Sequence, residues 1–156
     1  MAAAPWRLRG QARRIAARFA EVVCPPEVLT GRRTDLVLAE FERLLQVQRP
    51  YVRRTVSAGF VVLDRAAQLH PRCGGRRFVR LADEAAESHV RMLLTGRGAA
   101  AALARRLKGL LVLCYYELPQ VKEEIGYLPD PYIAMVSQRR LRLYAAEIQA
   151  GEAAGQ

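Results

Sequence analysis

Histidine and cysteine come close together in the sequence at His70-x-x-Cys73, a spacing that suits metal ligands. A structural zinc site needs four ligands of this kind. The other candidates, His89, Cys24 and Cys114, belong to different predicted helices, where packing explains them. The ordinary interpretation is a loop histidine beside a loop thiol, so we expect no metal in this chain.

Other reactive side chains lack the neighbours that catalysis requires. Ser57 and Ser88 lie in the middle of predicted helices, without a paired base in sequence reach. Glu123 and Glu124 are adjacent, so on a helix they point in different directions and do not form a pair of acid–base carboxylates. A phosphate-binding loop and a dinucleotide fingerprint are both missing from the sequence. We therefore predict no catalytic residue.

The cysteine pattern also limits cofactors and compartment. The chain has three cysteines, an odd number at wide spacing, which is not a disulfide framework. This fits a reducing compartment. There is no Cys-x-x-Cys-His, so no covalent haem is expected. We expect no cofactor-binding residue in this chain.

The net charge is +10 and is unevenly distributed. Residues 1–80 hold 16 Arg and 6 acidic residues, whereas residues 81–156 hold 9 basic and 9 acidic residues. Such asymmetry is compatible with nucleic acid, an anionic membrane or an acidic protein as partner. The alternative is that the arginine excess reflects the coding bias of a GC-rich genome and has no binding role, because Arg is far more abundant than Lys. Stacking aromatics and a DNA-docking helix pair are both lacking.

Apolar residues at helical spacing predict a series of helices. Thr34 and Asp130 are expected as N-caps, Pro50 and Pro131 at first helical positions, and Gly126 just past a helix end. The predicted helices cover residues 11–23, 34–49, 50–69, 83–94, 103–118, 119–125 and 131–149.

No segment alternates with period 2, and no repeat or linker is evident. The sequence therefore predicts an all-α protein, a single-domain bundle of five to seven helices over residues 11–149. A flexible basic tail is expected at 1–10 and a flexible tail at 150–156. In the connector 76–81, Phe78 and Leu81 are expected to insert into the core.

The N-terminal part and the apolar runs bear on location. Arg13-Arg14 invites a twin-arginine export signal, but Arg18 and Glu21 interrupt the apolar stretch that should follow. The longest apolar run, Gly109–Tyr116, is far shorter than the ~20 residues that span a bilayer. We expect a cytoplasmic protein without a transmembrane segment.

The most conspicuous segment is Cys114–Tyr127. Pro119 should end the long apolar helix and begin a short one, which Gly126 should end. The long helix is apolar nearly all round in its second half, which indicates a central position or a partner that covers it. Tyrosines are common interface anchors, so Tyr115 and Tyr116 are candidates for binding.

Two stretches carry recognisable residue patterns. The first, Gly75–Leu81, carries a Gly-x-x-Phe-x-x-Leu pattern, and the second, Leu107–Tyr127, carries Tyr-x-x-Pro-x-Val followed by Gly-Tyr. Together they resemble the gluconate 2-dehydrogenase subunit 3 family. Members are small helical partners of flavoproteins in the glucose–methanol–choline oxidoreductase class. The matched positions are Gly75, Phe78, Leu81, Tyr116, Pro119, Val121, Gly126 and Tyr127.

The resemblance implies a non-catalytic accessory subunit that binds and stabilises a flavin-dependent dehydrogenase, with FAD and catalysis in the partner. A hetero-oligomer is then expected. This sequence departs from many members in lacking their export signal and in adding the helix 131–149. Residues expected at the partner surface are Tyr115, Tyr116, Pro119, Val121, Gly126, Tyr127, Arg77 and Phe78. The alternative is an Arg-rich helical protein associated with nucleic acid or regulation.

Overall fold

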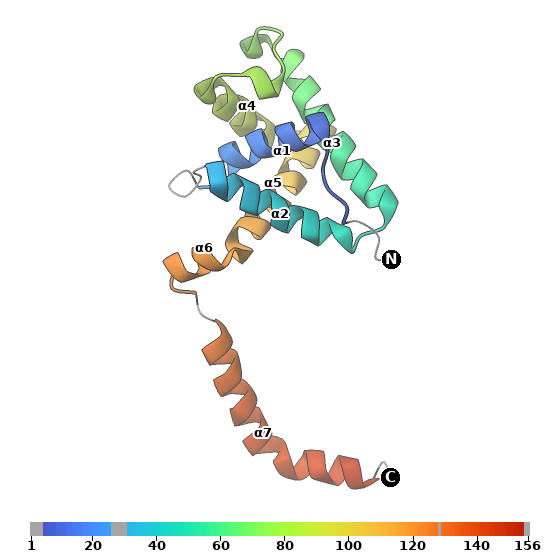
Figure 1. The fold of residues 1–156 in the computed structure, drawn as a ribbon, viewed down its shortest axis with the longest axis vertical. Helices are drawn as coiled ribbons and strands as arrows, with labels where there is room; N and C mark the ends of the chain where they lie inside the picture. Colours follow the sequence, from blue (N-terminus) through green and yellow to red (C-terminus); the bar gives the residue numbers. More distant parts are fainter. Residues whose placement is uncertain (1–4, 26–30, 128, 155–156) are drawn as a thin grey trace. The chain divides into compact units, whose positions relative to one another are not determined.

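The computed structural model describes residues 5–25, 31–127 and 129–154 (Figure 1). These residues form helices and no strand, which confirms the predicted all-α fold. The chain divides into two compact units, Met1–Leu118 and Pro119–Gln156. The elements are α1 (Gly10–Val23), α2 (Gly31–Gln46), α3 (Pro50–Gln68), the 3₁₀ helices η2 (Pro71–Cys73) and η3 (Phe78–Arg80), α4 (Asp83–Thr95), α5 (Ala99–Glu117), α6 (Pro119–Glu124) and α7 (Pro129–Ala154).

The first unit is a helical bundle in which α1 and α5 each contact the other long helices (Figure 1). The predicted apolar stripe of α5 is confirmed at Leu107, Leu111 and Cys114, which are buried. Leu103 and Leu110 are half-buried. Small residues of α5 are buried as well, which allows neighbouring helices to approach closely.

Four phenylalanines form a continuous chain of rings through the core. Phe41, Phe60, Phe19 and Phe78 follow one another with centroid separations of 5.9, 6.4 and 6.0 Å, each pair edge to face. They come from α2, α3, α1 and η3, and all are buried. Edge-to-face contacts of this kind stabilise a core beyond the burial of area alone. The predicted insertion of Phe78 into the core is confirmed, and so is that of Leu81, which is also buried.

Two buried carboxylates join segments that are distant in sequence. Asp64 on α3 is fully buried, and its oxygens accept hydrogen bonds from the Gln11 side chain at 3.2 Å and from the Val79 backbone N–H at 3.0 Å. Glu42 on α2 accepts a hydrogen bond from the backbone N–H of Leu8 at 3.1 Å. Because a buried charge is costly unless it is hydrogen-bonded, these contacts fix α1, η3 and the N-terminal segment in place.

Several arginines stabilise helix ends and inter-element contacts. The Arg53 guanidinium donates to the carbonyl of Leu45 in the last turn of α2 and to the carbonyl of Gln48 just after it. Arg105 does the same at the end of α4, donating to the carbonyls of Leu94 and Gly96 at 3.1 and 3.0 Å. Cations at helix C-termini satisfy orphan carbonyls and oppose the negative end of the dipole. Part of the arginine excess therefore serves the fold itself.

The predicted start of the second helix is wrong. Thr34 was expected as its N-cap, but α2 begins at Gly31 and Thr34 lies inside it. The Thr34 hydroxyl is buried and has no hydrogen-bond partner among the described residues. The residues directly before Thr34 also form helix, so Thr34 lies inside the helix instead of capping it. Pro50, in contrast, stands at the start of α3 as expected, after Arg49.

The expected N-terminal tail is also corrected over its described part. Residues 5–9 are not helical, but Leu8 is buried and its N–H is held by Glu42. The basic composition predicted a flexible tail. Burial of the Leu8 side chain and the hydrogen bond from its N–H to the buried Glu42 instead hold this segment in place. Residues 1–4 lie outside the described residues.

The second unit contains α6 and α7. Gly126 has φ +68°, its N–H donates to the Glu123 carbonyl, and the Tyr127 N–H donates to the Lys122 carbonyl at 2.8 Å. This pair of bonds is a Schellman motif, which confirms the predicted glycine cap. The pattern needs a left-handed residue, and glycine adopts that conformation without a steric penalty.

The boundaries of the last helix differ from the prediction. It begins at Pro129 instead of Pro131 and continues to Ala154 instead of ending near residue 149. Both prolines fit the first turn, where backbone N–H groups have no intrahelical acceptor. The expected flexible tail 150–156 is therefore helical over 150–154. The bundle domain expected over 11–149 instead divides after Leu118.

Replacing Gly109 of α5 with alanine should raise the free energy of unfolding by about 0.5–1 kcal/mol. Glycine is a poor helix former, and a Cβ added here meets no atom within 4 Å. Gly59→Ala on α3 is the matched control, because its Cβ would meet Leu103 Cδ1 at 3.0 Å and should gain less. Urea unfolding of both variants measures the difference. A loss of stability in Gly109→Ala would contradict the prediction.

Candidate functional site

The residues expected at a partner surface separate into exposed and buried ones. Tyr116 is 44% exposed and Tyr127 56% exposed. Pro119 and Gly126 are also exposed, and Arg77 is half-buried. These five stay candidates for contact with a partner.

The other three expected residues are buried. Tyr115 is 3% exposed, Phe78 is in the aromatic core, and Val121 is buried as well. Tyr115 and Tyr116 lie edge to face with ring centroids 5.1 Å apart. Because adjacent helical residues point about 100° apart, one tyrosine of the pair enters the core while the other stays at the surface. A partner could reach Tyr115, Phe78 or Val121 only after a rearrangement, so they are removed from the candidate surface.

The groups considered for catalysis remain apart. The Ser57 hydroxyl donates to the Arg53 carbonyl at 2.9 Å, one turn earlier in the same helix. This is the usual bond of a mid-helix serine and leaves the hydroxyl without a general base. Glu123 and Glu124 are exposed. The described residues therefore offer no nucleophile paired with a base at these positions.

Three cysteines are free and buried, but they differ in surroundings. Burial raises the pKa of the Cys24 thiol to about 11, with Lys108 opposing the shift. Burial also raises the pKa of the Cys114 thiol to about 12, and the carboxylate of Glu40 adds to the effect. A thiol of such high pKa is a poor nucleophile at neutral pH, so these two cysteines behave as apolar core residues.

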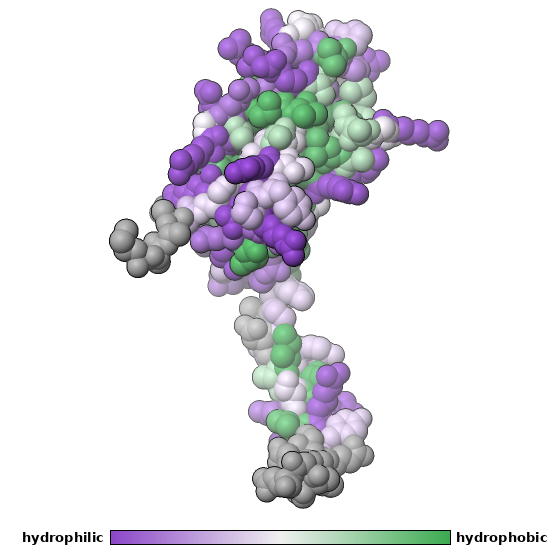
Figure 2. Space-filling model, turned by 90° about the vertical axis from the view of Figure 1, so that its right-hand side faces the viewer, coloured by the Kyte–Doolittle hydropathy of each residue, from purple (hydrophilic) through white to green (hydrophobic). Residues whose placement is uncertain are grey.

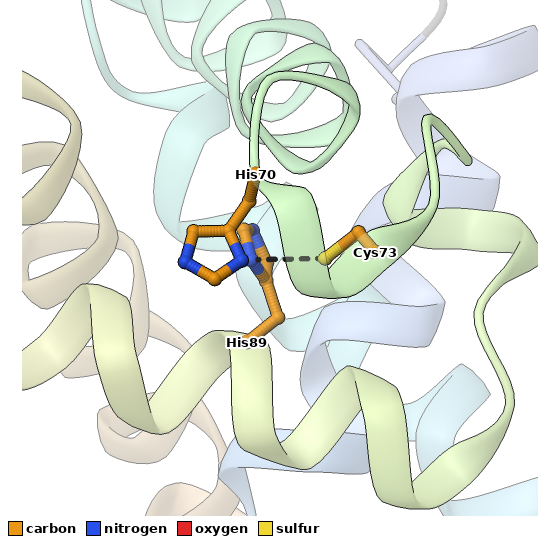
Figure 3. A group of neighbouring side chains, drawn as sticks. All are labelled: His70, Cys73 and His89. Carbon is orange, nitrogen blue, oxygen red and sulfur yellow. Dashed lines mark hydrogen bonds between the residues drawn. The ribbon is translucent and has the colours of Figure 1, made fainter.

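The third cysteine, Cys73, lies in a cluster with two histidines that the sequence did not predict. His70, Cys73 and His89 each offer a ligand atom, and these atoms all lie within 4.8 Å of one another. Cys73 Sγ is 3.5 Å from His89 Nδ1. Figure 3 shows the three side chains directed toward one another, His70 and Cys73 from the turn after α3 and His89 from α4.

Burial controls the protonation of this cluster. It raises the pKa of the Cys73 thiol and lowers the pKa of the His89 imidazole, and the nearby His70 lowers the pKa of His89 further. Neutral imidazole is therefore the favoured form of His89 near pH 7. The ring of His89 also packs against Phe78, with centroids 6.2 Å apart, so the chain of core aromatic rings ends at this cluster.

The sequence signal for this cluster was incomplete. His70 and Cys73 have the spacing of metal ligands, but His89 belongs to a different predicted helix, where packing explains it. No local sequence pattern predicts that α4 packs against the turn after α3. The contact between α4 and η2 supplies that information.

A second polar hollow is basic. Arg14 from α1 and Arg77 and Arg80 around η3 line a cavity of about 240 Å³ together with Gln11 and Val79. Two of its lining residues, Gln11 and Val79, donate hydrogen bonds to Asp64, so these two polar groups already have partners within the fold. The cavity adds a local positive region to the first unit.

Comparison of the chain with protein families, with curated proteins and with solved structures finds no match. Among the described helices, none combines the length and apolarity needed to cross a bilayer. The family resemblance therefore rests on the residues quoted for it.

Proposed function

We propose that this chain is a non-catalytic accessory subunit that binds a larger protein. The partner class that the resemblance implies is a flavin-dependent dehydrogenase, which would hold FAD and carry out the reaction. The observation that supports the proposal most directly is the exposure of large apolar side chains along α7. Monomeric proteins rarely leave such side chains together at the surface without a binding role.

Helix α7 has 26 residues and is about 39 Å long at 1.5 Å per residue. Each of six large apolar side chains on it is at least 50% exposed. Figure 2 shows apolar and polar side chains next to one another on the described part of this unit. The six are Tyr132, Ile133, Met135, Leu141, Leu143 and Tyr144.

Four of these side chains share one side of the helix. At 100° per residue, Tyr132, Ile133, Leu143 and Tyr144 fall within a sector of about 120°. Arg140 falls within the same sector and could meet a carboxylate of the partner. This side has the width of a core-facing stripe, which suits burial against a partner.

The first unit offers a smaller apolar surface at the end of α5. Leu113 is 50% exposed, and Tyr116 lies one turn further along the helix. Tyrosine suits such a position because it buries a large ring and keeps a hydroxyl for a hydrogen bond. Tyr116 is also one of the positions that carry the family resemblance, so we assign it to the partner surface.

Affinity purification of the tagged chain from its source cells tests the proposal. We expect a larger flavin-containing oxidoreductase to be recovered, identified by its flavin absorbance and by mass spectrometry. The double variant Ile133→Glu with Leu143→Glu should reduce recovery at least tenfold, because burying two such side chains stabilises a complex by roughly 3 kcal/mol. Both positions are exposed, so the bundle should fold normally.

Gln138→Glu is the control for added charge, because it introduces one of the two negative charges of the double variant, on the opposite side of α7. It should leave recovery unchanged. Retention of nucleic acid that is lost at high salt, without any flavoprotein, would refute the proposal and favour the Arg-rich alternative.

A further inference from the structure

We propose that His70, Cys73 and His89 bind a single zinc ion, which links the turn after α3 to α4. This assignment reverses the expectation from sequence that the chain binds no metal. It is independent of the proposed partner, because none of the three residues belongs to the surface assigned to that partner.

The separation of Cys73 Sγ and His89 Nδ1 suits a tetrahedral ion, and all three ligand atoms lie within 4.8 Å of one another. With Zn–S and Zn–N bonds of ordinary length, a sulfur and a nitrogen on one tetrahedral ion are separated by about 3.6 Å. The observed separation of Cys73 Sγ and His89 Nδ1 is 3.5 Å. A thiol–imidazole hydrogen bond has the same length, so this pair alone does not decide the matter.

The unpartnered ring nitrogens provide independent evidence. His70 Nδ1 and His89 Nε2 are both buried and have no hydrogen-bond partner among the described residues. A buried polar atom left unpartnered costs about 1–3 kcal/mol. In Figure 3 the His70 ring turns a nitrogen toward Cys73 and His89. Coordination through His70 Nδ1 would remove one of the two orphans.

The space around the cluster fits one ion and a small ligand. A cavity of about 40 Å³ adjoins the three residues and is also lined by Ser88 and Met92. A cavity of this size holds one or two water molecules. Three protein ligands with a water in the fourth position are a common arrangement for zinc.

The turn holds two of the ligands in place before any ion binds. The Cys73 backbone N–H donates to the His70 carbonyl at 2.9 Å, and the Gly74 N–H donates to the Pro71 carbonyl at 3.2 Å. Gly74 has φ +56°, a left-handed conformation that closes the 3₁₀ turn and returns the chain.

Ligand chemistry selects the class of metal. One thiolate and two imidazoles suit Zn²⁺, whereas Mg²⁺ and Ca²⁺ require oxygen ligands. The described cluster contains no carboxylate. Among soft or borderline ions, Zn²⁺ matches a tetrahedral set with neutral imidazoles most directly.

Metal titration of the purified full-length chain tests the assignment. After treatment with a chelator, we expect one Zn²⁺ per chain to bind and the melting temperature to rise. Co²⁺ in place of Zn²⁺ should give the near-ultraviolet thiolate charge-transfer band and the strong visible bands of a tetrahedral cobalt–thiolate site. Cys73→Ser should abolish the charge-transfer band, and His89→Gln should weaken Zn²⁺ binding at least 100-fold.

Cys24→Ser is the matched control, because Cys24 is also a free buried cysteine and lies outside the cluster. Its cobalt spectrum should equal that of the unaltered chain. Absence of stoichiometric zinc binding by the unaltered chain overturns the proposal, and this readout does not depend on any variant folding. A charge-transfer band that survives in Cys73→Ser, or uptake of copper(I) without zinc, overturns it as well.

Discussion

Replacing Phe60 with alanine is expected to lower the free energy of unfolding by about 4 kcal/mol, the largest effect of any single change considered. Phe60 is fully buried on α3 and lies in the middle of the aromatic chain, between Phe19 and Phe41. Truncation removes its buried area, leaves a cavity, and breaks two edge-to-face contacts at once. Because helices from three segments meet at this ring, the cavity cannot collapse without moving one of them.

Urea unfolding followed by circular dichroism measures this change. Tyr51→Ala on the same helix is the matched control, because Tyr51 is 64% exposed and its loss should change stability by less than about 0.5 kcal/mol. A loss below about 2 kcal/mol for Phe60→Ala would contradict the packing described for the core.

Asp64→Ala is expected to lower the free energy of unfolding by about 3 kcal/mol. The fully buried carboxylate accepts hydrogen bonds from Gln11 and from the Val79 backbone, and hydrogen bonds to charged groups contribute about 1.5–3 kcal/mol each. Removing the carboxylate leaves the Val79 N–H without its acceptor. The connection between α1, α3 and η3 is weakened as a result.

Two further variants separate this effect from a general loss of charge. Asp64→Asn keeps an acceptor for Val79 and should lose less stability than Asp64→Ala. Asp35→Ala removes an acid of the same type from a surface ion pair with Arg13, where Asp35 is 67% exposed. That change should cost less than about 1 kcal/mol in the same urea experiment. Equal losses for Asp64→Ala and Asp35→Ala would contradict the role assigned to burial.

The helices were predictable because the spacing of their apolar residues, and the residues that begin and end them, are local features of the sequence. Pro50 and Gly126 act within one turn of their own position, so the sequence is enough to place them. Thr34 shows the limit of the same reasoning, because a capping residue in sequence becomes an interior residue when the preceding turn also forms helix. The burial of Leu8 depends on Glu42, which lies 34 residues away, and local patterns do not contain that contact.

The candidate sites show the same division. Exposure of Tyr116 and burial of Tyr115 follow from which side of α5 meets the other helices, which a single periodic pattern leaves open where the helix is apolar all round. The His70, Cys73 and His89 cluster depends on the return of α4 to the turn after α3. Two of its three residues were visible as a motif, and tertiary packing supplied the third.

The position of α1 has a consequence for synthesis of the chain. Its buried side chains, including Ile15 and Phe19, meet residues of α3, α4 and α5, and α5 ends at Glu117. At about 5–20 residues per second, translation of the intervening segment takes roughly 5–20 s. During that interval α2 and α3 emerge first and cover part of the apolar side of α1. The part of α1 that contacts α4 and α5 stays exposed on the nascent chain until those two helices emerge.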